Sequence, residues 1–187
     1  MNNQVQAELK KIFNNRFSTS ESTRANYARG EDTYDPILSK AVVFPETNEE
    51  VSKILSLCNQ HKIPVVPFGT GTSLEGNVVG NEKGITISLE KMNKILNVNA
   101  EDFDCRVQAC VTKEQLNEYL REDGVFFPID PGANAAIGGM ASTSASGTMA
   151  VKYGTMKTVI SGLTVVLPNG DIIKTGSRTK KTSAGYN

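Results

Sequence analysis

Two glycine-rich segments contain the residues whose types and spacing suit ligand chemistry. The first, at 64–77, reads Pro-Val-Val-Pro-Phe-Gly-Thr-Gly-Thr-Ser-Leu-Glu-Gly-Asn. The second, at 130–148, reads Asp-Pro-Gly-Ala-Asn-Ala-Ala-Ile-Gly-Gly-Met-Ala-Ser-Thr-Ser-Ala-Ser-Gly-Thr. Neither contains Lys or Arg, and both are rich in small and hydroxyl-bearing residues. Backbone N–H groups of such loops can approach an anion closely and hold it without an ion pair. The two segments therefore predict a site for a phosphate-bearing ligand.

The spacing of the glycines argues against the two most familiar nucleotide-binding loops. A P-loop ends in Gly-Lys-Ser or Gly-Lys-Thr, which neither segment contains. A dinucleotide loop of the GxGxxG type lies between a strand and a helix, whereas the first segment has Gly69, Gly71 and Gly76 and no helical pattern after them. Each segment alone is equally consistent with a tight turn. Their joint occurrence with Tyr153-Gly154-Thr155 favours a ligand site.

The supply of metal-binding and nucleophilic side chains is small. The chain has three cysteines, no CxxC pair and one histidine, His61, so we expect no metal site. His61 ends a predicted helix, where a cation suits the helix dipole, and this role is favoured over catalysis. Cys105 falls on the apolar face of a predicted strand and Cys110 on the opposite face, so we expect no disulfide between them. Catalytic residues stay unassigned.

Composition excludes several classes of protein. The 187 residues are 39% hydrophobic, and 20 Lys and Arg balance 20 Asp and Glu. A neutral chain has no overall field to attract nucleic acid or anionic lipid, and no apolar run is long enough to span a bilayer. The first residues lack the apolar region of a secretion signal. We therefore expect a cytoplasmic protein without a nucleic-acid partner, and peripheral association with a membrane stays open.

The first half of the chain predicts a strand–helix–strand unit that leads into the first glycine segment. Residues 4–14 have helical spacing, and residues 18–35 are polar and irregular, as in a surface loop. Strands are predicted at 41–45 and 63–68, and between them a capping box at 47–50 begins a helix. Such a unit favours parallel strands. The predicted helical faces are Val5, Leu9, Ile12 and Phe13, and then Val51, Ile54, Leu55 and Cys58.

From Gly84 onward the pattern changes to strands with a period of two. Strands are predicted at 85–89, 95–98 and 103–109, with Phe103, Cys105, Val107 and Ala109 on one face. A capping box at Thr112 begins a helix that ends at Gly124, with Leu116, Tyr119 and Leu120 on its core face. Pro168-Asn169-Gly170 predicts a hairpin between strands 159–167 and 171–175. The change predicts two subdomains with a crevice between them, which is a common place for a cofactor.

Five stretches together resemble one protein family. They are Val-Val-Pro-Phe-Gly-Thr-Gly-Thr-Ser-Leu-Glu-Gly, Phe-Pro-Ile-Asp-Pro-Gly-Ala, Ile-Gly-Gly-Met-Ala-Ser-Thr-Ser-Ala-Ser-Gly-Thr, Tyr-Gly-Thr-Met-Lys and Val-Val-Leu-Pro-Asn-Gly. In order and spacing they resemble the N-terminal part of FAD-linked 2-hydroxy-acid dehydrogenases. This is the D-lactate dehydrogenase and glycolate oxidase FAD-subunit group of the vanillyl-alcohol-oxidase superfamily. The resemblance extends from about residue 37 to Asn187.

The resemblance implies an α+β fold, the PCMH-type FAD-binding domain, built from two α+β subdomains. Residues 1–36 would form a helix and a loop, residues 37–83 a small subdomain containing the strand–helix–strand unit, and residues 84–187 a larger subdomain with a mixed or antiparallel sheet. Family members continue with a Gly-Ser-Glu-Gly-Thr-Leu-Gly stretch and a substrate-binding cap domain. We therefore expect a C-terminally truncated domain without the cap, either a fragment or a chain completed by a partner chain.

The resemblance also implies a set of FAD-binding residues. Because the first loop has neither His nor Cys, non-covalent FAD is expected. Glu75 would repel a pyrophosphate, so we expect its side chain to turn outward or to cap a neighbouring amide. The implied cofactor-binding residues are Pro67, Phe68, Gly69, Thr70, Gly71, Thr72, Ser73, Gly76, Asn77, Pro131, Gly132, Ala133, Gly138, Gly139, Ala141, Ser142, Ser146, Gly147, Tyr153 and Gly154.

The implied activity is that of an FAD-dependent oxidoreductase acting on CH–OH groups. Electrons would pass from a 2-hydroxy acid such as D-lactate or glycolate to FAD, and on to a quinone or a cytochrome-type acceptor. Two alternatives remain: a truncated, non-catalytic flavin-binding module that needs a partner chain, and an NADPH-dependent enolpyruvyl-sugar reductase, which the Asp-Pro-Gly-Ala and Gly-Gly-Met-Ala runs fit less well. Five cations are candidates for binding a substrate carboxylate, although a solvated surface role is favoured for each: Arg29, Arg106, Lys152, Lys157 and Arg178.

Overall fold

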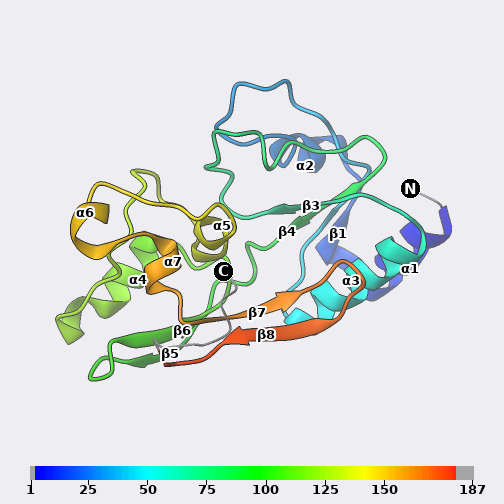
Figure 1. Ribbon diagram of the computed structural model, residues 1–187. Coiled ribbons are helices and arrows are strands. Elements are labelled where there is room, and N and C mark those ends of the chain that lie inside the picture. The colour runs from blue at the N-terminus through cyan, green and yellow to red at the C-terminus, as the bar shows by residue number, and fades with distance from the viewer. Residues whose placement is uncertain (1–2, 180–187) are drawn as a thin grey trace. The chain divides into compact units, whose positions relative to one another are not determined.

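The computed structural model describes residues 3–179, which form two compact units (Figure 1). Unit 1 contains the described residues up to Met92 together with Val166–Ile173. Unit 2 contains Asn93–Val165 and the described residues from Lys174 onward. The α+β fold class with two mixed subdomains is confirmed.

Unit 1 is built on a four-stranded sheet in the order β1-β2-β4-β3. Strands β2 (Val42–Val43) and β3 (Val65–Phe68) both run parallel to β4 (Ile85–Ser88), and β1 (Phe17–Ser18) is antiparallel to β2. Helix α3 (Asn48–Gln60) connects β2 to β3, which confirms the predicted strand–helix–strand unit. The sequence pattern had placed β4 at the start of the second subdomain, whereas in the structure it lies between β2 and β3.

Helices α1 (Asn3–Phe13) and α3 cover one face of this sheet. Their buried side chains form a single core with the strands: Val5, Leu9, Phe13, Ile54, Leu57, Cys58, Ala41, Val43, Ile85 and Ile87. The predicted helix at 4–14 is confirmed, but the placement of Ile12 on its buried face is wrong, because Ile12 is 43% exposed. A short 3-10 helix, η1 (Asn14–Arg16), follows α1 and turns the chain into β1.

The opposite face of the sheet carries buried polar side chains that contact the N-terminal region. Thr86 and Ser88 of β4 are fully buried, and Thr86 Oγ1 donates to Ser39 Oγ at 2.8 Å. The prediction of a plain loop at 18–35 is wrong, since helix α2 (Glu21–Asn26) lies within it. Ser20 caps this helix by accepting from the Thr23 amide at 3.3 Å, a signal that the sequence contains just before Glu21.

The capping box of α3 is built differently from the prediction. Thr47 Oγ1 accepts from the Glu50 amide at 3.2 Å, as expected. The Glu50 carboxylate accepts from the Glu46 amide at 2.7 Å and from both terminal nitrogens of Arg16 at 2.6 Å. These bonds, with Arg16 contributing most, hold the pKa of Glu50 below its usual value.

The Arg16–Glu50 pair makes a pH-dependent contribution to stability. Because the pKa of Glu50 is lower in the folded chain, this contribution is complete above the unfolded pKa of about 4.3 and is lost as the pH falls through the folded pKa. We expect Glu50→Gln to lower the free energy of unfolding at pH 7 by about 1–2 kcal/mol. Urea denaturation should show this difference shrinking below about pH 4. A difference that stays constant from pH 7 to pH 3 would contradict the assignment.

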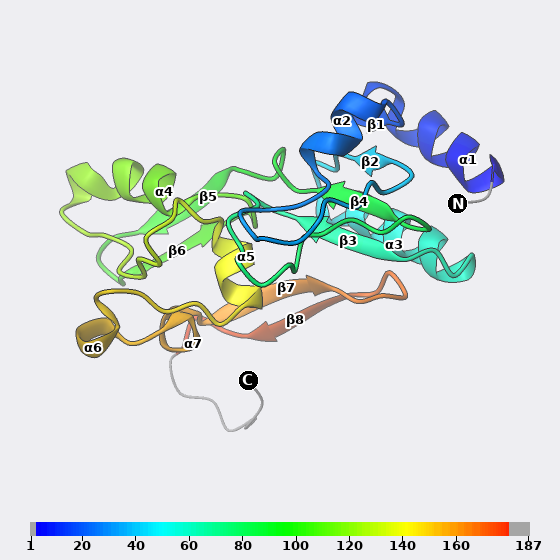
Figure 2. The same cartoon turned by 90° about the horizontal axis from the view of Figure 1, so that it is seen from above.

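In unit 2, an antiparallel hairpin of β5 (Ile95–Asn99) and β6 (Asp104–Val107) packs against α4 (Lys113–Leu120) (Figure 2). The core of this part consists of Val111, Leu116 and Leu120 packed on Ile95, Val98, Cys105 and Val107. Thr112 caps α4, and Gly124, with φ +70°, ends η2 (Arg121–Asp123), as predicted for the end of the helical segment. Two predictions are wrong: Tyr119 is 59% exposed, and Phe103 is 83% exposed because it lies in the β5–β6 turn.

The rest of the described chain contains three short helices and a second hairpin. Met140 of α5 (Ile137–Ser142) and Met156 of α7 (Met156–Val159) are buried with Ile129 and Ala135, and α6 (Ala150–Tyr153) lies between these helices in sequence. The predicted hairpin of β7 (Gly162–Val166) and β8 (Ile172–Gly176) is present, and its first strand begins later than expected because α7 takes residues up to Val159.

The tip of this hairpin belongs to unit 1, where Ser52 Oγ donates to the Gly170 carbonyl at 2.5 Å.

None of the helices formed by residues 3–179 is long and apolar enough to cross a membrane.

Candidate cofactor-binding site

The first glycine loop, residues 69–80, begins directly after β3. Within the described chain, eight of its backbone N–H groups donate to no protein acceptor: those of Gly69, Gly71, Thr72, Ser73, Leu74, Gly76, Asn77 and Val78. Gly71 has φ +74°, and a Cβ added there would lie 2.8 Å from Cζ of Phe68. The loop thus has the unpaired donors and the small residues that close approach of an anion requires.

Side chains of the same loop contribute hydroxyl groups and leave its one carboxylate outside. Ser73 Oγ accepts from Asn77 Nδ2 at 3.0 Å, and the hydroxyls of Thr70 and Thr72 lie 3.4 Å apart. Glu75 is exposed, in agreement with the expected outward orientation. The loop can therefore offer amides and hydroxyls to an anion while the Glu75 carboxylate stays in solvent.

The second glycine segment, residues 130–148, begins with a turn that Asp130 fixes. Lys113 Nζ lies 2.9 Å from Asp130 Oδ1, and the Gly132 amide donates to the same oxygen at 3.0 Å. These bonds, that of Lys113 first, lower the pKa of Asp130. Gly132 has φ +91° and nothing within 4 Å of an added Cβ, so its conformation requires glycine while its surroundings are open.

The adjacent glycines of α5 have different surroundings. The Gly138 amide donates to the Ala109 carbonyl at 2.8 Å, and an added Cβ would lie 2.8 Å from Cβ of Ala109. Gly139 has no atom closer than 4.0 Å to an added Cβ, and its amide has no acceptor among the described residues. Gly138 therefore permits packing, whereas Gly139 is accessible to a ligand. Ser142, which is also exposed, donates from Oγ to the Gly138 carbonyl at 2.9 Å.

The end of the second segment is held by backbone contacts. An added Cβ at Gly147 would lie 2.0 Å from the Asp130 carbonyl oxygen, and the Thr148 amide donates to that oxygen at 3.2 Å. Gly147 therefore serves to bring the two ends of the segment together. Ser146, next to it, is exposed.

The third predicted cluster, around Tyr153, includes an aromatic residue that the sequence did not indicate. The Tyr153 ring meets Phe126 edge to face, with centroids 5.5 Å apart, and Lys152 Nζ lies 5.0 Å from the Tyr153 centroid. Phe126 is 50% exposed, which no periodic pattern predicts. Gly154, with φ +82°, packs against Thr158, whose Oγ1 would lie 2.2 Å from an added Cβ.

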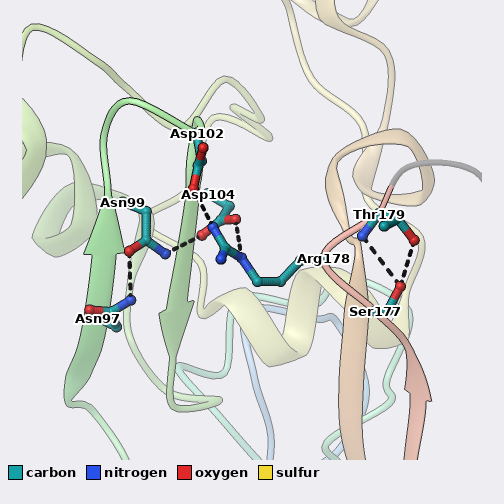
Figure 3. Close-up of polar contacts among 7 residues, drawn as sticks. All are labelled: Asn97, Asn99, Asp102, Asp104, Ser177, Arg178 and Thr179. Atoms are coloured by element: carbon teal, nitrogen blue, oxygen red, sulfur yellow. Dashed lines mark hydrogen bonds and ion pairs between the residues drawn. The ribbon is translucent and has the colours of Figure 1, made fainter.

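Arg178, one of the five cations considered for a substrate carboxylate, is already paired. Its Nε donates to Asp104 at 2.7 Å and one terminal nitrogen donates to Asp102 at 2.6 Å (Figure 3). Asn99 donates to the other oxygen of Asp104 at 2.6 Å, and this bond, followed by those of Arg178, lowers the pKa of Asp104. Arg178 thus anchors the segment after β8 to the β5–β6 turn, and the other four cations are exposed.

The thiols and the histidine occupy structural positions. Burial raises the pKa of Cys58 to about 11, so this thiol stays protonated near neutral pH and packs as part of the unit 1 core. Burial also raises the pKa of Cys105, with a further contribution from Asp104. None of the three cysteines forms a disulfide among the described residues, and His61 is exposed at the C-terminal end of α3.

The structure thus assigns the predicted site residues to two units. The first glycine loop lies in unit 1, and the residues of the second segment and the Tyr153 cluster lie in unit 2. Within each unit, the predicted residues divide into those open to a ligand and those that shape the loop.

Comparisons with known proteins identify the family. The profile of the family described as FAD binding domain matches residues 39–176. The chain is 42% identical over 182 residues to the mitochondrial D-lactate dehydrogenase [cytochrome] of Arabidopsis thaliana, covering 96% of this chain and 32% of that protein. It is 46% identical over 173 residues to a probable mitochondrial D-lactate dehydrogenase of Danio rerio (91% and 35%), and 34% identical over 172 residues to the glycolate oxidase subunit GlcD of Bacillus subtilis (91% and 37%).

Solved structures agree on the fold. The chain matches alkyldihydroxyacetonephosphate synthase with a TM-score of 0.84 and 21% identity, over 95% of this chain and 36% of that one. It matches p-cresol methylhydroxylase with a TM-score of 0.80 and 26% identity, over 93% and 35%. The chain spans about a third of the length of the curated relatives that it matches. It belongs to the FAD binding domain family, which confirms the resemblance of its five sequence stretches.

Proposed function

We propose that this chain is the FAD-binding part of a flavin-dependent 2-hydroxy-acid dehydrogenase of the D-lactate or glycolate type. The observation that carries the proposal is the run of unpaired amides in the first glycine loop, which includes those of Gly69, Thr72 and Ser73, in a chain whose residues 39–176 match the FAD binding domain. The names of the relatives, D-lactate dehydrogenases and a glycolate oxidase subunit, support the substrate class.

The residues present fit FAD. Its pyrophosphate carries two negative charges, and oriented N–H groups with neighbouring hydroxyls can bind such a group without a cation. The first glycine loop has these donors, and glycine at position 71 lets the loop pack closely against the Phe68 ring. Bound FAD supplies the hydride-accepting chemistry, and this chain binds the cofactor, orients it and limits the access of water.

We divide the predicted FAD-binding residues by role. Those proposed to contact the cofactor belong to half-buried or exposed residues: the amides of Gly69, Thr72 and Ser73, the Gly139 amide and the hydroxyls of Ser142 and Ser146. Those proposed to shape the loops are packed against backbone or side chains: Gly138, Gly147 and Gly154. Binding is proposed to be non-covalent, because the first loop has neither His nor Cys.

We assign the base and the substrate-carboxylate group to a cap domain or a partner chain. Oxidation of a 2-hydroxy acid needs a group that takes the hydroxyl proton and a group that binds the carboxylate. His61 is exposed at the end of α3, and Arg178 is paired with two aspartates. The proposed electron acceptor, a quinone or a cytochrome, follows the name of the Arabidopsis relative, which specifies a cytochrome.

The absorption spectrum of the purified chain tests the proposal. After incubation with excess FAD and desalting, we expect the visible flavin bands to be retained, with a Kd of about 1 µM or tighter. FMN lacks the pyrophosphate and the adenosine, so we expect it to bind at least about tenfold more weakly if the loop amides recognise the pyrophosphate.

The outcomes separate the proposal from its alternatives. Loss of the bands on adding D-lactate or glycolate, with the cap domain or partner chain present, would support the dehydrogenase. Retained FAD that neither acid reduces would indicate a non-catalytic flavin module. A chain that retains no flavin would refute the cofactor assignment.

A further inference from the structure

Residues 28–37, which we name the clamp segment, precede residue 39, where the match to the FAD binding domain begins. Figure 1 shows this segment and the first glycine loop running together above β3 and β4 in unit 1. The sequence predicted only a polar surface loop here. The contacts between the two segments indicate a more specific role.

The two segments are joined through their backbones. The Glu31 amide donates to the Gly71 carbonyl at 2.8 Å, and the Gly80 amide donates to the Ala28 carbonyl at 2.9 Å. Gly30 approaches so closely that an added Cβ would lie 2.3 Å from the Gly71 carbonyl oxygen. The clamp segment therefore holds the loop at both ends, near Gly71 and at Gly80.

The clamp segment also determines which residues the loop can contain. The Tyr34 ring lies against Gly76, where an added Cβ would be 2.7 Å from two ring atoms. An added Cβ at Gly80 would lie 1.9 Å from the Ile37 carbonyl oxygen. Gly76 has φ +71°, so its conformation and its contact with Tyr34 both require glycine.

Asp32 fixes the shape of the clamp segment. Its Oδ2 accepts from the Gly30 amide and its Oδ1 from the Tyr34 amide, each at 3.0 Å. Asp32 is 7% exposed and forms no ion pair with another residue in the range 3–179. A buried carboxylate without a cation is stabilised by charge-assisted hydrogen bonds from amides. Asp32 can therefore stay buried only in the conformation of the segment that makes these two bonds.

We propose that Asp32 is a positioning residue for FAD binding: it fixes residues 28–37, and these hold the first glycine loop in the conformation that leaves the amides of Gly69, Thr72 and Ser73 without a protein acceptor. This inference rests on the proposed function. Asp32 acts on the cofactor through the loop and does not contact it.

Three variants of the full chain test the inference. In Asp32→Ala both acceptors are lost, and we expect the FAD Kd, measured by flavin fluorescence, to rise at least about tenfold. In Asp32→Asn one acceptor oxygen remains, and we expect an intermediate Kd. Glu50→Gln removes a carboxylate of the same unit that also accepts amide and cation bonds, and we expect its Kd to stay within about twofold of the unmodified chain.

Hydrogen exchange of the FAD-free proteins gives a second readout that is independent of the cofactor. In Asp32→Ala we expect the amides of Glu31 and Gly80, which join the clamp segment to the loop, to exchange at least about tenfold faster. Glu50→Gln is also expected to lower global stability, so the exchange of these two amides in that variant gives the effect of general destabilisation alone, and we expect their rates in Asp32→Ala to be clearly higher. General destabilisation would instead raise the exchange of both variants together.

Three outcomes would overturn the inference: an unchanged Kd in Asp32→Ala, equal weakening in Glu50→Gln, or unchanged exchange at Glu31 and Gly80. If Asp32→Ala does not fold, Tyr34→Ala replaces it, because Tyr34 is 55% exposed and its ring covers Gly76. An unchanged FAD Kd in Tyr34→Ala would also overturn the inference that the clamp segment holds the first glycine loop. If the unmodified chain binds no FAD, the proposed function fails, and the exchange rates alone decide whether Asp32 holds the loop.

Discussion

Replacing Gly147 with alanine is expected to abolish FAD binding and to destabilise the second glycine segment. The added Cβ would lie 2.0 Å from the carbonyl oxygen, 2.3 Å from the carbonyl carbon and 2.8 Å from the nitrogen of Asp130. All three are backbone atoms, so no side-chain rotation relieves the overlap. We expect the free energy of unfolding to fall by about 3 kcal/mol and the FAD Kd to rise more than about 100-fold. Urea denaturation and flavin fluorescence measure the two effects.

Gly124→Ala is the matched control for this prediction. Gly124 has φ +70°, so alanine is strained there, but nothing lies within 4 Å of the added Cβ. We expect a loss of about 1 kcal/mol and an unchanged FAD Kd. If Gly147→Ala lost no more stability and no more FAD affinity than Gly124→Ala, the close contact between Gly147 and Asp130 would have no functional importance.

The elements that local signals specify could be predicted from the sequence. The Thr47 and Thr112 caps, the end of the α4 segment at Gly124 and the hairpin at 168–170 are all present. Each depends on hydrogen bonds or dihedral angles within a few residues, so the sequence contains the whole cause. The glycine segments indicated a phosphate-bearing ligand for the same reason, whereas FAD followed from the family resemblance.

Features that depend on contacts between distant residues could not be predicted. The insertion of β4 between β2 and β3 is set by pairing across the sheet, not by the residues of β4 itself. Ile12 and Tyr119 have suitable spacing for a helical core face but are exposed, because the packing partners decide how wide that face is. The clamp formed by residues 28–37 has no local pattern, since its role arises from contacts with residues 71–80.

Gly139 offers the sharpest test of where FAD is bound, because stability and binding should change in opposite directions. Gly139 lies in α5, and the nearest atom to an added Cβ is 4.0 Å away. Alanine should therefore stabilise the folded chain slightly, by up to about 1 kcal/mol, through its higher helix propensity. If FAD approaches the Gly139 amide, the methyl group occupies the space of the cofactor, and we expect Kd to rise about tenfold for Gly139→Ala and more than about 100-fold for Gly139→Leu.

A surface leucine elsewhere in unit 2 controls for nonspecific effects of the larger side chain. Glu122 of η2 is exposed, and we expect Glu122→Leu to leave the FAD Kd unchanged. Gly138→Ala completes the comparison, because its Cβ would meet Ala109 at 2.8 Å and should lower stability. Substitution of the two adjacent glycines would then have different effects: Gly138→Ala would lower the stability of the fold, and Gly139→Leu would weaken FAD binding. If Gly139→Leu folds and binds FAD as the unmodified chain does, the cofactor does not approach α5, and the assignment of that segment to the binding site is wrong.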